Sequence, residues 1–103
     1  MKILHLDKNH DSLINELKSC GYINVEAYKM TLDNVKSIIH QFDGVVIRSR
    51  FKIDTDFLKN GKRIKFIARV GSGLENIDIQ YLKKRGIELI SAPEGNSLSL
   101  MHI

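Results

Sequence analysis

Two arginines flank a serine at Arg48, Ser49 and Arg50, directly after the β-branched run at residues 44–47 (GVVI). A guanidinium group binds carboxylate or phosphate oxygens through two parallel hydrogen bonds, and a serine hydroxyl adds a neutral donor. In an extended backbone, Arg48 and Arg50 would face the same side. A solvated loop with surface charges is the alternative. We favour an anion-binding loop, because ligands of open parallel sheets bind beyond the carboxyl ends of the strands.

A second loop, Gly71-Ser72-Gly73, follows the apolar run at residues 66–70. Its glycines tolerate positive φ and let the backbone approach a ligand closely. A helix that begins near Asn76 would direct free N–H groups toward a bound anion. The loop is not the dinucleotide fingerprint G-x-G-x-x-G, because Asn76 stands where the third glycine is expected. A structural tight turn is an equally good interpretation of this loop taken alone.

The remaining reactive side chains do not form a recognisable catalytic or metal-binding group. The four histidines lack metal-ligand spacing, and no nucleophile lies beside a base. His5 alternates within a strand pattern, which favours a packed histidine. Asp54 and Asp56 are interpreted as helix-start residues, where negative charge is favourable. Cys20, beside a glycine in an apolar-periodic segment, is interpreted as a small buried side chain.

Composition indicates an ordinary globular chain. It has 103 residues, of which 43% are hydrophobic and 27% charged, which fits one compact domain. No apolar run approaches the roughly 20 residues of a membrane helix. Asp7 and Lys8 end the N-terminal apolar run too early for a secretory signal. We therefore expect a cytoplasmic protein without membrane partners, and a single cysteine suits that reducing compartment.

The net charge of +4 makes anionic partners worth considering. The lysines are spread along the whole chain and mixed with acidic residues. The one local basic cluster comprises Lys59, Lys62, Arg63 and Lys65. It has no interleaved aromatic residues on which bases could stack, so we interpret it as a solvated loop and do not expect a nucleic-acid partner.

These side chains would be positioned by β-like runs that alternate with amphipathic helical stretches. Strands are expected at residues 2–6, 24–28, 44–47, 66–70 and 87–91. Helices are expected at residues 11–20, after the N-cap Thr31, at residues 54–58 and at residues 76–85, with Gly21 and Gly86 as stops. Five strands separated by helices predict an α/β fold, with a parallel five-stranded sheet and helices on both faces.

At the two loops the sequence resembles the N-terminal region of the D-2-hydroxyacid dehydrogenases, most of all their phosphoglycerate branch. Three blocks carry the resemblance: VVIRSRFKID (45–54), KFIARVGSGLENID (65–78) and RGIELISAPEGN (85–96). Their order and spacing are more specific than any one block. The resemblance implies a flavodoxin-like (Rossmann-like) domain of an enzyme that transfers hydride between NAD and a 2-hydroxy or 2-keto acid.

The same resemblance implies roles for five residues. Arg48, Ser49 and Arg50 would contact the substrate, notably its phosphate. Ser72 and Gly73 match a loop whose backbone amides hold the substrate carboxylate. Small anionic 2-hydroxy acids or phosphorylated acids are therefore the expected partners.

Residues on either side of these five also match the family's sequence pattern. Asn76 and Asp78 correspond to the loop and helix start that fix the glycine turn. Residues 93–96 correspond to the segment that leads into the hinge.

The resemblance also implies what this sequence lacks. We expect residues 1–96 to form the substrate-binding domain and residues 97–103 to be the truncated start of the hinge or crossing segment. The NAD-binding domain, its glycine loop and the catalytic residues would all lie outside the chain. The domain alone should therefore be inactive.

Two other classes of function were weighed. A receiver-type signalling domain has a similar pattern, but it needs a phosphoacceptor aspartate after the third strand, where Arg48 stands. A non-catalytic binding or assembly module is the other alternative. The apolar residues in the segment 97–103 favour association, including a homo-oligomer, because an exposed apolar patch is a liability.

Overall fold

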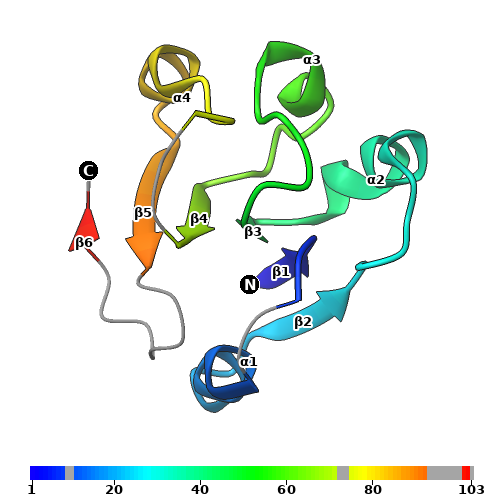
Figure 1. Cartoon of the computed structure of the whole chain (residues 1–103), viewed down its shortest axis with the longest axis vertical. Helices are drawn as coiled ribbons and strands as arrows, with labels where there is room; N and C mark the ends of the chain where they lie inside the picture. Colours follow the sequence, from blue (N-terminus) through cyan, green and yellow to red (C-terminus); the bar gives the residue numbers. More distant parts are fainter. Residues whose placement is uncertain (9–10, 72–74, 93–100, 103) are drawn as a thin grey trace.

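The computed structural model describes residues 1–8, 11–71, 75–92 and 101–102. Its centre is one six-stranded sheet with the strand order β2-β1-β3-β4-β5-β6 (Figure 1). The strands are β1 Lys2–His5, β2 Ile23–Glu26, β3 Gly44–Ile47, β4 Phe66–Val70, β5 Glu88–Ala92 and β6 Met101–His102. The first five strands are parallel, which confirms the predicted α/β fold class.

A sixth strand was not predicted. In β6, Met101 and His102 pair in the antiparallel direction with Ser91 and Ile90 of β5. A two-residue strand has no periodicity of its own. Its conformation depends on the edge that β5 offers, which no local sequence pattern reveals.

Several helix ends lie at capping residues that the sequence indicates. They are α1 Asp11–Ser19, α2 Leu32–Ile38, the 3₁₀ turn η1 Ile39–Gln41, α3 Thr55–Leu58 and α4 Ile79–Arg85. Thr31 Oγ1 accepts a hydrogen bond from Asn34 N at 3.2 Å, and Asp54 Oδ1 accepts one from Phe57 N at 3.0 Å. Gly86 ends α4 with φ of 70°. These caps satisfy backbone groups that a helix end leaves unpaired.

Three local predictions were wrong. The helix α4 begins at Ile79, capped by Asp78, so Asn76 does not stand at a helix N-terminus. Cys20 is exposed because it lies in the turn after α1, beyond the helix face that packs on the sheet. The second strand is also shifted, since β2 ends at Glu26 and Tyr28 belongs to the following turn.

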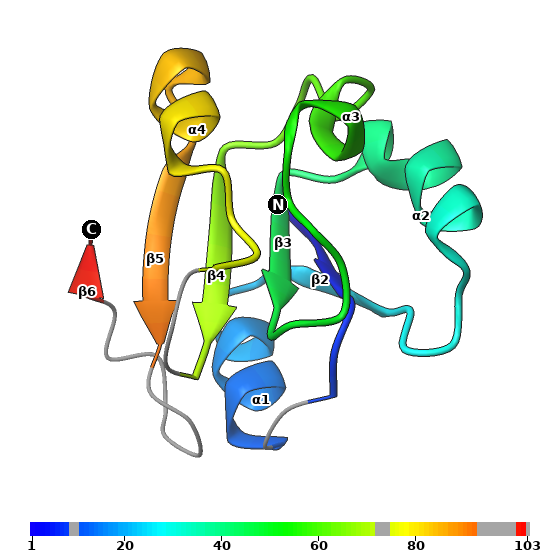
Figure 2. The same ribbon diagram turned by 45° about the horizontal axis from the view of Figure 1, so that its top comes forward.

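Helices cover both faces of the sheet, as predicted (Figure 2). Helix α1 packs on one face through Leu13 and Leu17, which contact Ile3, Val46 and Ala68 of the strands. On the other face, α2, α3 and α4 cover a larger core that includes Val35, Phe57, Leu58, Leu82, Leu4, Val45 and Ile67. Burial of these apolar side chains is the main term that stabilises the domain.

His5 is packed in the sheet, as the sequence predicted, and is 1% exposed. Its Nε2 is 2.7 Å from Asn24 Oδ1 on the neighbouring strand β2. Burial lowers the pKa of His5 below its ordinary value of 6.5, although the hydrogen bond to Asn24 opposes this shift.

The lowered pKa of His5 predicts a pH dependence of stability. Below pH 6.5 the unfolded chain binds a proton that the folded chain resists, so the free energy of unfolding should fall as pH falls. Urea unfolding between pH 7.5 and pH 5 should show this slope, and His5→Gln should reduce it. His40→Gln, which replaces an exposed imidazole, is the matched control. An unchanged slope in His5→Gln would contradict the assignment.

Within the described part of the chain, no helix is long and apolar enough to cross a membrane. The same residues contain no group of three or more His, Cys, Asp or Glu side chains that could hold a metal ion.

Candidate functional site

The loops that follow β1 and β3 meet at the carboxyl edge of the sheet, at the point where the strand order reverses. Asp7 follows β1, and its Oδ2 accepts hydrogen bonds from the backbone N–H groups of Arg48 at 2.7 Å and Arg50 at 3.2 Å. In sheets with this strand order, ligands bind at this switch point. The loop predicted to bind an anion is therefore at the expected place, and Asp7 holds its backbone.

Arg50 joins three loops through its guanidinium group. Nη1 donates to Leu6 O at 2.9 Å and to Ala27 O at 2.6 Å, and Nη2 donates to Met30 O. The guanidinium carbon lies 4.6 Å from the centre of the Phe51 ring. The sequence indicated a ligand-binding role for Arg50. In the structure, its guanidinium connects the segments that follow β1, β2 and β3.

Arg48 and Ser49 belong to the loop whose backbone Asp7 holds. Arg48 is half-buried and Ser49 is exposed. The backbone carbonyl of Arg48 accepts a hydrogen bond from Asn76 Nδ2 at 3.2 Å. The backbone on both sides of Ser49 is thus held by side chains from other segments, which presents this serine at the surface of the carboxyl edge.

Asn76 links the β3 loop to the end of β4. Its Nδ2 also donates to Phe51 O at 3.0 Å, and its Oδ1 accepts from Arg69 Nε at 3.1 Å. Ile53 pairs with the neighbouring Ile77 as an isolated parallel bridge. The resemblance implies that Asn76 fixes the glycine turn, most of which lies outside the described residues; the contacts in the structure are to the β3 loop and to Arg69.

Sequence reasoning missed Asp7 and Arg69 as parts of the site. In the sequence, Asp7 is noted only as a residue that ends the N-terminal apolar run, although a carboxylate directly after a buried strand is also suited to accept backbone N–H groups. Arg69 is 7% exposed within the otherwise apolar strand β4 and also donates to Val70 O. A charged residue inside an apolar run was the signal available for it.

The glycine loop is described only at its first residue. Gly71 has φ of 100°, which confirms the positive φ that its sequence suggested. A Cβ at this position would lie 3.2 Å from Arg69 Nη1. Ser72 and Gly73, the other two predicted site residues, lie outside the described residues.

The arrangement is suited to hold an anion, because a cationic side chain and a hydroxyl lie at one edge on a braced backbone. A shallow hollow of about 460 Å³ borders this region and is lined by Glu26, Ala27, Tyr28, Lys29, Met30 and Asn34. There, burial and the hydrogen bond from Tyr28 Oη to Glu26 raise the pKa of Tyr28 to about 12, so its hydroxyl stays protonated at neutral pH. A larger cleft lies at the opposite, amino edge of the sheet.

Comparison with known proteins assigns the family. The sequence profile of "D-isomer specific 2-hydroxyacid dehydrogenase, catalytic domain" matches residues 3–100. D-3-phosphoglycerate dehydrogenase of Methanocaldococcus jannaschii is 31% identical over 103 residues, which are 100% of this chain and 20% of the relative. Hydroxypyruvate reductase of Thermotoga maritima is 33% identical over 98 residues, which are 95% of this chain and 31% of the relative.

Solved structures agree with this assignment. The NAD⁺-bound 3-phosphoglycerate dehydrogenase of Entamoeba histolytica superposes with a TM-score of 0.72 and 30% identity, over 88% of this chain and 32% of that one. The chain thus spans between a fifth and a third of the length of these relatives. By its sequence profile and its fold, the chain belongs to the D-isomer specific 2-hydroxyacid dehydrogenases and corresponds to their catalytic domain.

Proposed function

We propose that the chain is the substrate-binding part of an NAD-dependent dehydrogenase that acts on an anionic 2-hydroxy acid, with 3-phosphoglycerate as its substrate. The braced loop at Arg48 and Ser49, at the switch point of the sheet, carries this proposal. The phosphoglycerate dehydrogenase of Methanocaldococcus jannaschii, similar along the whole chain, supports the choice of substrate. An enzyme with this substrate would work in the cytoplasm.

The proposal gives the five predicted residues different tasks. Arg48 would bind the phosphate through its guanidinium group, and Ser49 would donate its hydroxyl. The backbone amides of Ser72 and Gly73 would hold the carboxylate. Arg50 would act mainly as a positioning residue, because its guanidinium already donates to three backbone carbonyls.

NAD would supply or accept the hydride in the complete enzyme, but the described residues do not fit a dinucleotide. The carboxylate of Asp7 follows β1 where a glycine loop would be required, and Asp11 lies in the first turn of α1. Two acidic side chains would repel a pyrophosphate at this helix start. We therefore propose that residues 1–96 form the substrate-binding domain and that a separate domain binds NAD.

A titration tests the substrate assignment. Adding 3-phosphoglycerate to the ¹⁵N-labelled chain should shift the amide resonances of residues 48–50 and 71–73. Arg48→Gln should weaken binding about tenfold, since it removes a charge-assisted bidentate contact.

Lys83→Gln is the matched control, because it removes the same charge from an exposed position on α4. Equal weakening by both substitutions would show general attraction to the basic chain. Shifts confined to other parts of the sheet would also contradict the proposed site.

A further inference from the structure

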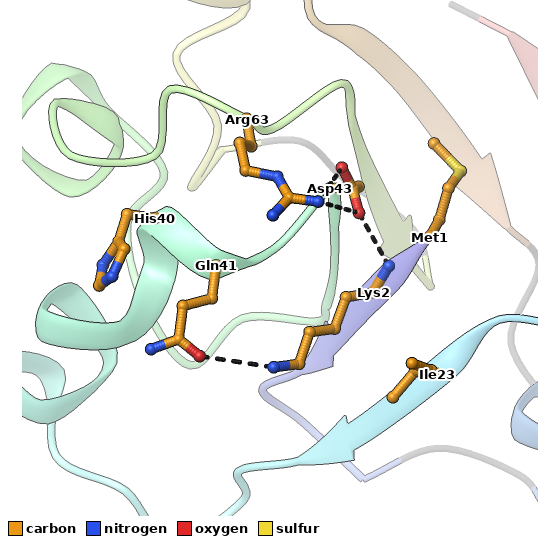
Figure 3. Close-up of a pocket in the computed structure, with 7 residues that line it drawn as sticks. All are labelled: Met1, Lys2, Ile23, His40, Gln41, Asp43 and Arg63. Atoms are coloured by element: carbon orange, nitrogen blue, oxygen red, sulfur yellow. Dashed lines mark hydrogen bonds and ion pairs between the residues drawn. The ribbon is translucent and has the colours of Figure 1, made fainter.

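A second cleft lies at the amino edge of the sheet, away from the substrate loops. Its volume is about 680 Å³. It is lined by Met1, Lys2, Ile23, His40, Gln41, Asp43 and Arg63 (Figure 3). These residues come from β1, β2, η1 and the segments that precede β3 and β4, so only the folded sheet brings them together.

Asp43 forms the floor of this cleft, and its carboxylate already accepts hydrogen bonds from other residues of the chain. Its side chain is 9% exposed, and Oδ2 accepts the backbone N–H of Lys2 at 2.9 Å. Both carboxylate oxygens lie 3.3 Å from Arg63 Nη2. The hydrogen bond from the Lys2 N–H lowers the pKa of Asp43 below its usual range, and the Arg63 guanidinium adds a smaller effect in the same direction. Asp43 thus stays ionised and anchors Arg63 at the mouth of the cleft.

The cationic groups retain capacity to bind. Arg63 keeps 62% of its side chain exposed although it is paired with Asp43. Among the described contacts it bonds through Nη2, so the Nε and Nη1 donors are available. Lys2 Nζ makes one long hydrogen bond, 3.4 Å to Gln41 Oε1, and lies 5.2 Å from the centre of the Phe42 ring.

The geometry of these donors favours one class of ligand. Figure 3 shows the Lys2 ammonium and the Arg63 guanidinium on two sides of the same hollow, with the Gln41 amide close to Lys2. Two side-chain cations face one carboxylate, which leaves a net positive charge. A compact ligand with several acceptor oxygens would satisfy both cations at once.

We infer that this cleft is a binding site for a small phosphate-bearing anion, held between Lys2 and Arg63. The site is independent of the proposed substrate loop, because the two lie at opposite edges of the sheet. It also gives a role to Arg63, the member of the basic cluster whose guanidinium is held in a fixed position by a buried carboxylate.

The alternative is that these basic residues only compensate the negative C-terminal end of α2 and η1. Attraction of this kind would be diffuse and sensitive to net charge alone. A specific site depends instead on the position of the charge, which matched substitutions can distinguish.

The test is an NMR titration of the ¹⁵N-labelled chain with inorganic phosphate, compared with sodium chloride at equal ionic strength. Phosphate, but not chloride, should produce saturable shifts at Lys2, Gln41, Asp43 and Arg63. Lys2→Gln and Arg63→Gln should each weaken binding at least about fivefold. Lys62→Gln removes the same charge from the adjacent exposed position and should change the affinity less than about twofold.

Three results would overturn the inference. They are shifts that grow linearly without saturation, a response limited to residues 48–50, and equal weakening in all three variants. Lys2→Gln and Arg63→Gln change side chains at separate positions and leave the backbone N–H of Lys2 in place for Asp43. Either variant is therefore sufficient if the other does not fold.

Discussion

Replacing Asn76 with alanine is expected to lower the free energy of unfolding by about 3 kcal/mol, because three hydrogen bonds in a half-buried position are lost together. The carbonyls of Arg48 and Phe51 would lose their donor, and the buried Arg69 would lose an acceptor. Urea unfolding followed by circular dichroism measures the change. A loss below about 1 kcal/mol would contradict the role of Asn76 as the link between the loops.

Two further variants separate the contributions of Asn76. Asn76→Asp keeps an oxygen for Arg69 Nε but replaces the amide that donates to Arg48 O and Phe51 O. It should destabilise about as much as alanine, because the ion pair gained with Arg69 is offset by a carboxylate oxygen that lies against the carbonyl oxygens of Arg48 and Phe51. Asn60→Ala, at an exposed loop position, is the control and should stay within about 0.5 kcal/mol of the parent.

Replacing Arg50 with methionine should have the next largest effect, a loss of about 2 kcal/mol, since three backbone carbonyls lose a charged donor while the aliphatic stem is preserved. The same variant should weaken 3-phosphoglycerate binding, because the backbone that carries Arg48 and Ser49 would no longer be held from the β1 and β2 side. Denaturant unfolding and the NMR titration measure the two effects on one sample.

The two interpretations of Arg50 predict different results. As a positioning residue, Arg50→Met should increase the exchange rate of the amides of Arg48 and Ser49 in the absence of ligand. Arg50→Lys should recover part of the stability, because an ammonium can still donate to one or two of the carbonyls. Lys52→Met, at an exposed position of the same loop, is the matched control. Lost binding with unchanged stability and exchange would instead identify Arg50 as a direct ligand of the substrate.

The positions of these residues show how the site depends on the fold. Asp7, Arg50 and Asn76 lie in three different loops, and each forms hydrogen bonds to a segment that is more than twenty residues away in sequence. The proposed substrate loop is thus held by long-range contacts on both sides. Because ligand binding at a strand edge needs a preorganised backbone, these contacts are as important to the proposed site as the side chains that touch the anion.

The sequence alone determined the features that depend on local interactions. The α/β alternation, the caps at Thr31 and Asp54, and the left-handed Gly86 were predicted because periodicity and capping involve neighbouring residues. Similarly, the buried His5 followed from the alternation of its strand. The proposal of an anion loop after β3 followed from the general behaviour of open parallel sheets.

Only the tertiary structure decided the contacts between distant segments. The start of α4 moved from Asn76 to Ile79 because the backbone at residues 76–78 pairs with Ile53. The Arg50 guanidinium donates to three carbonyls in the loops after β1 and β2, and Lys2, Asp43 and Arg63 line one cleft at the other edge. Each of these contacts joins residues that the sheet brings together across 20 or more positions. A periodic pattern reports which face of an element is buried, but it carries no information about which distant carbonyl or carboxylate a side chain will meet.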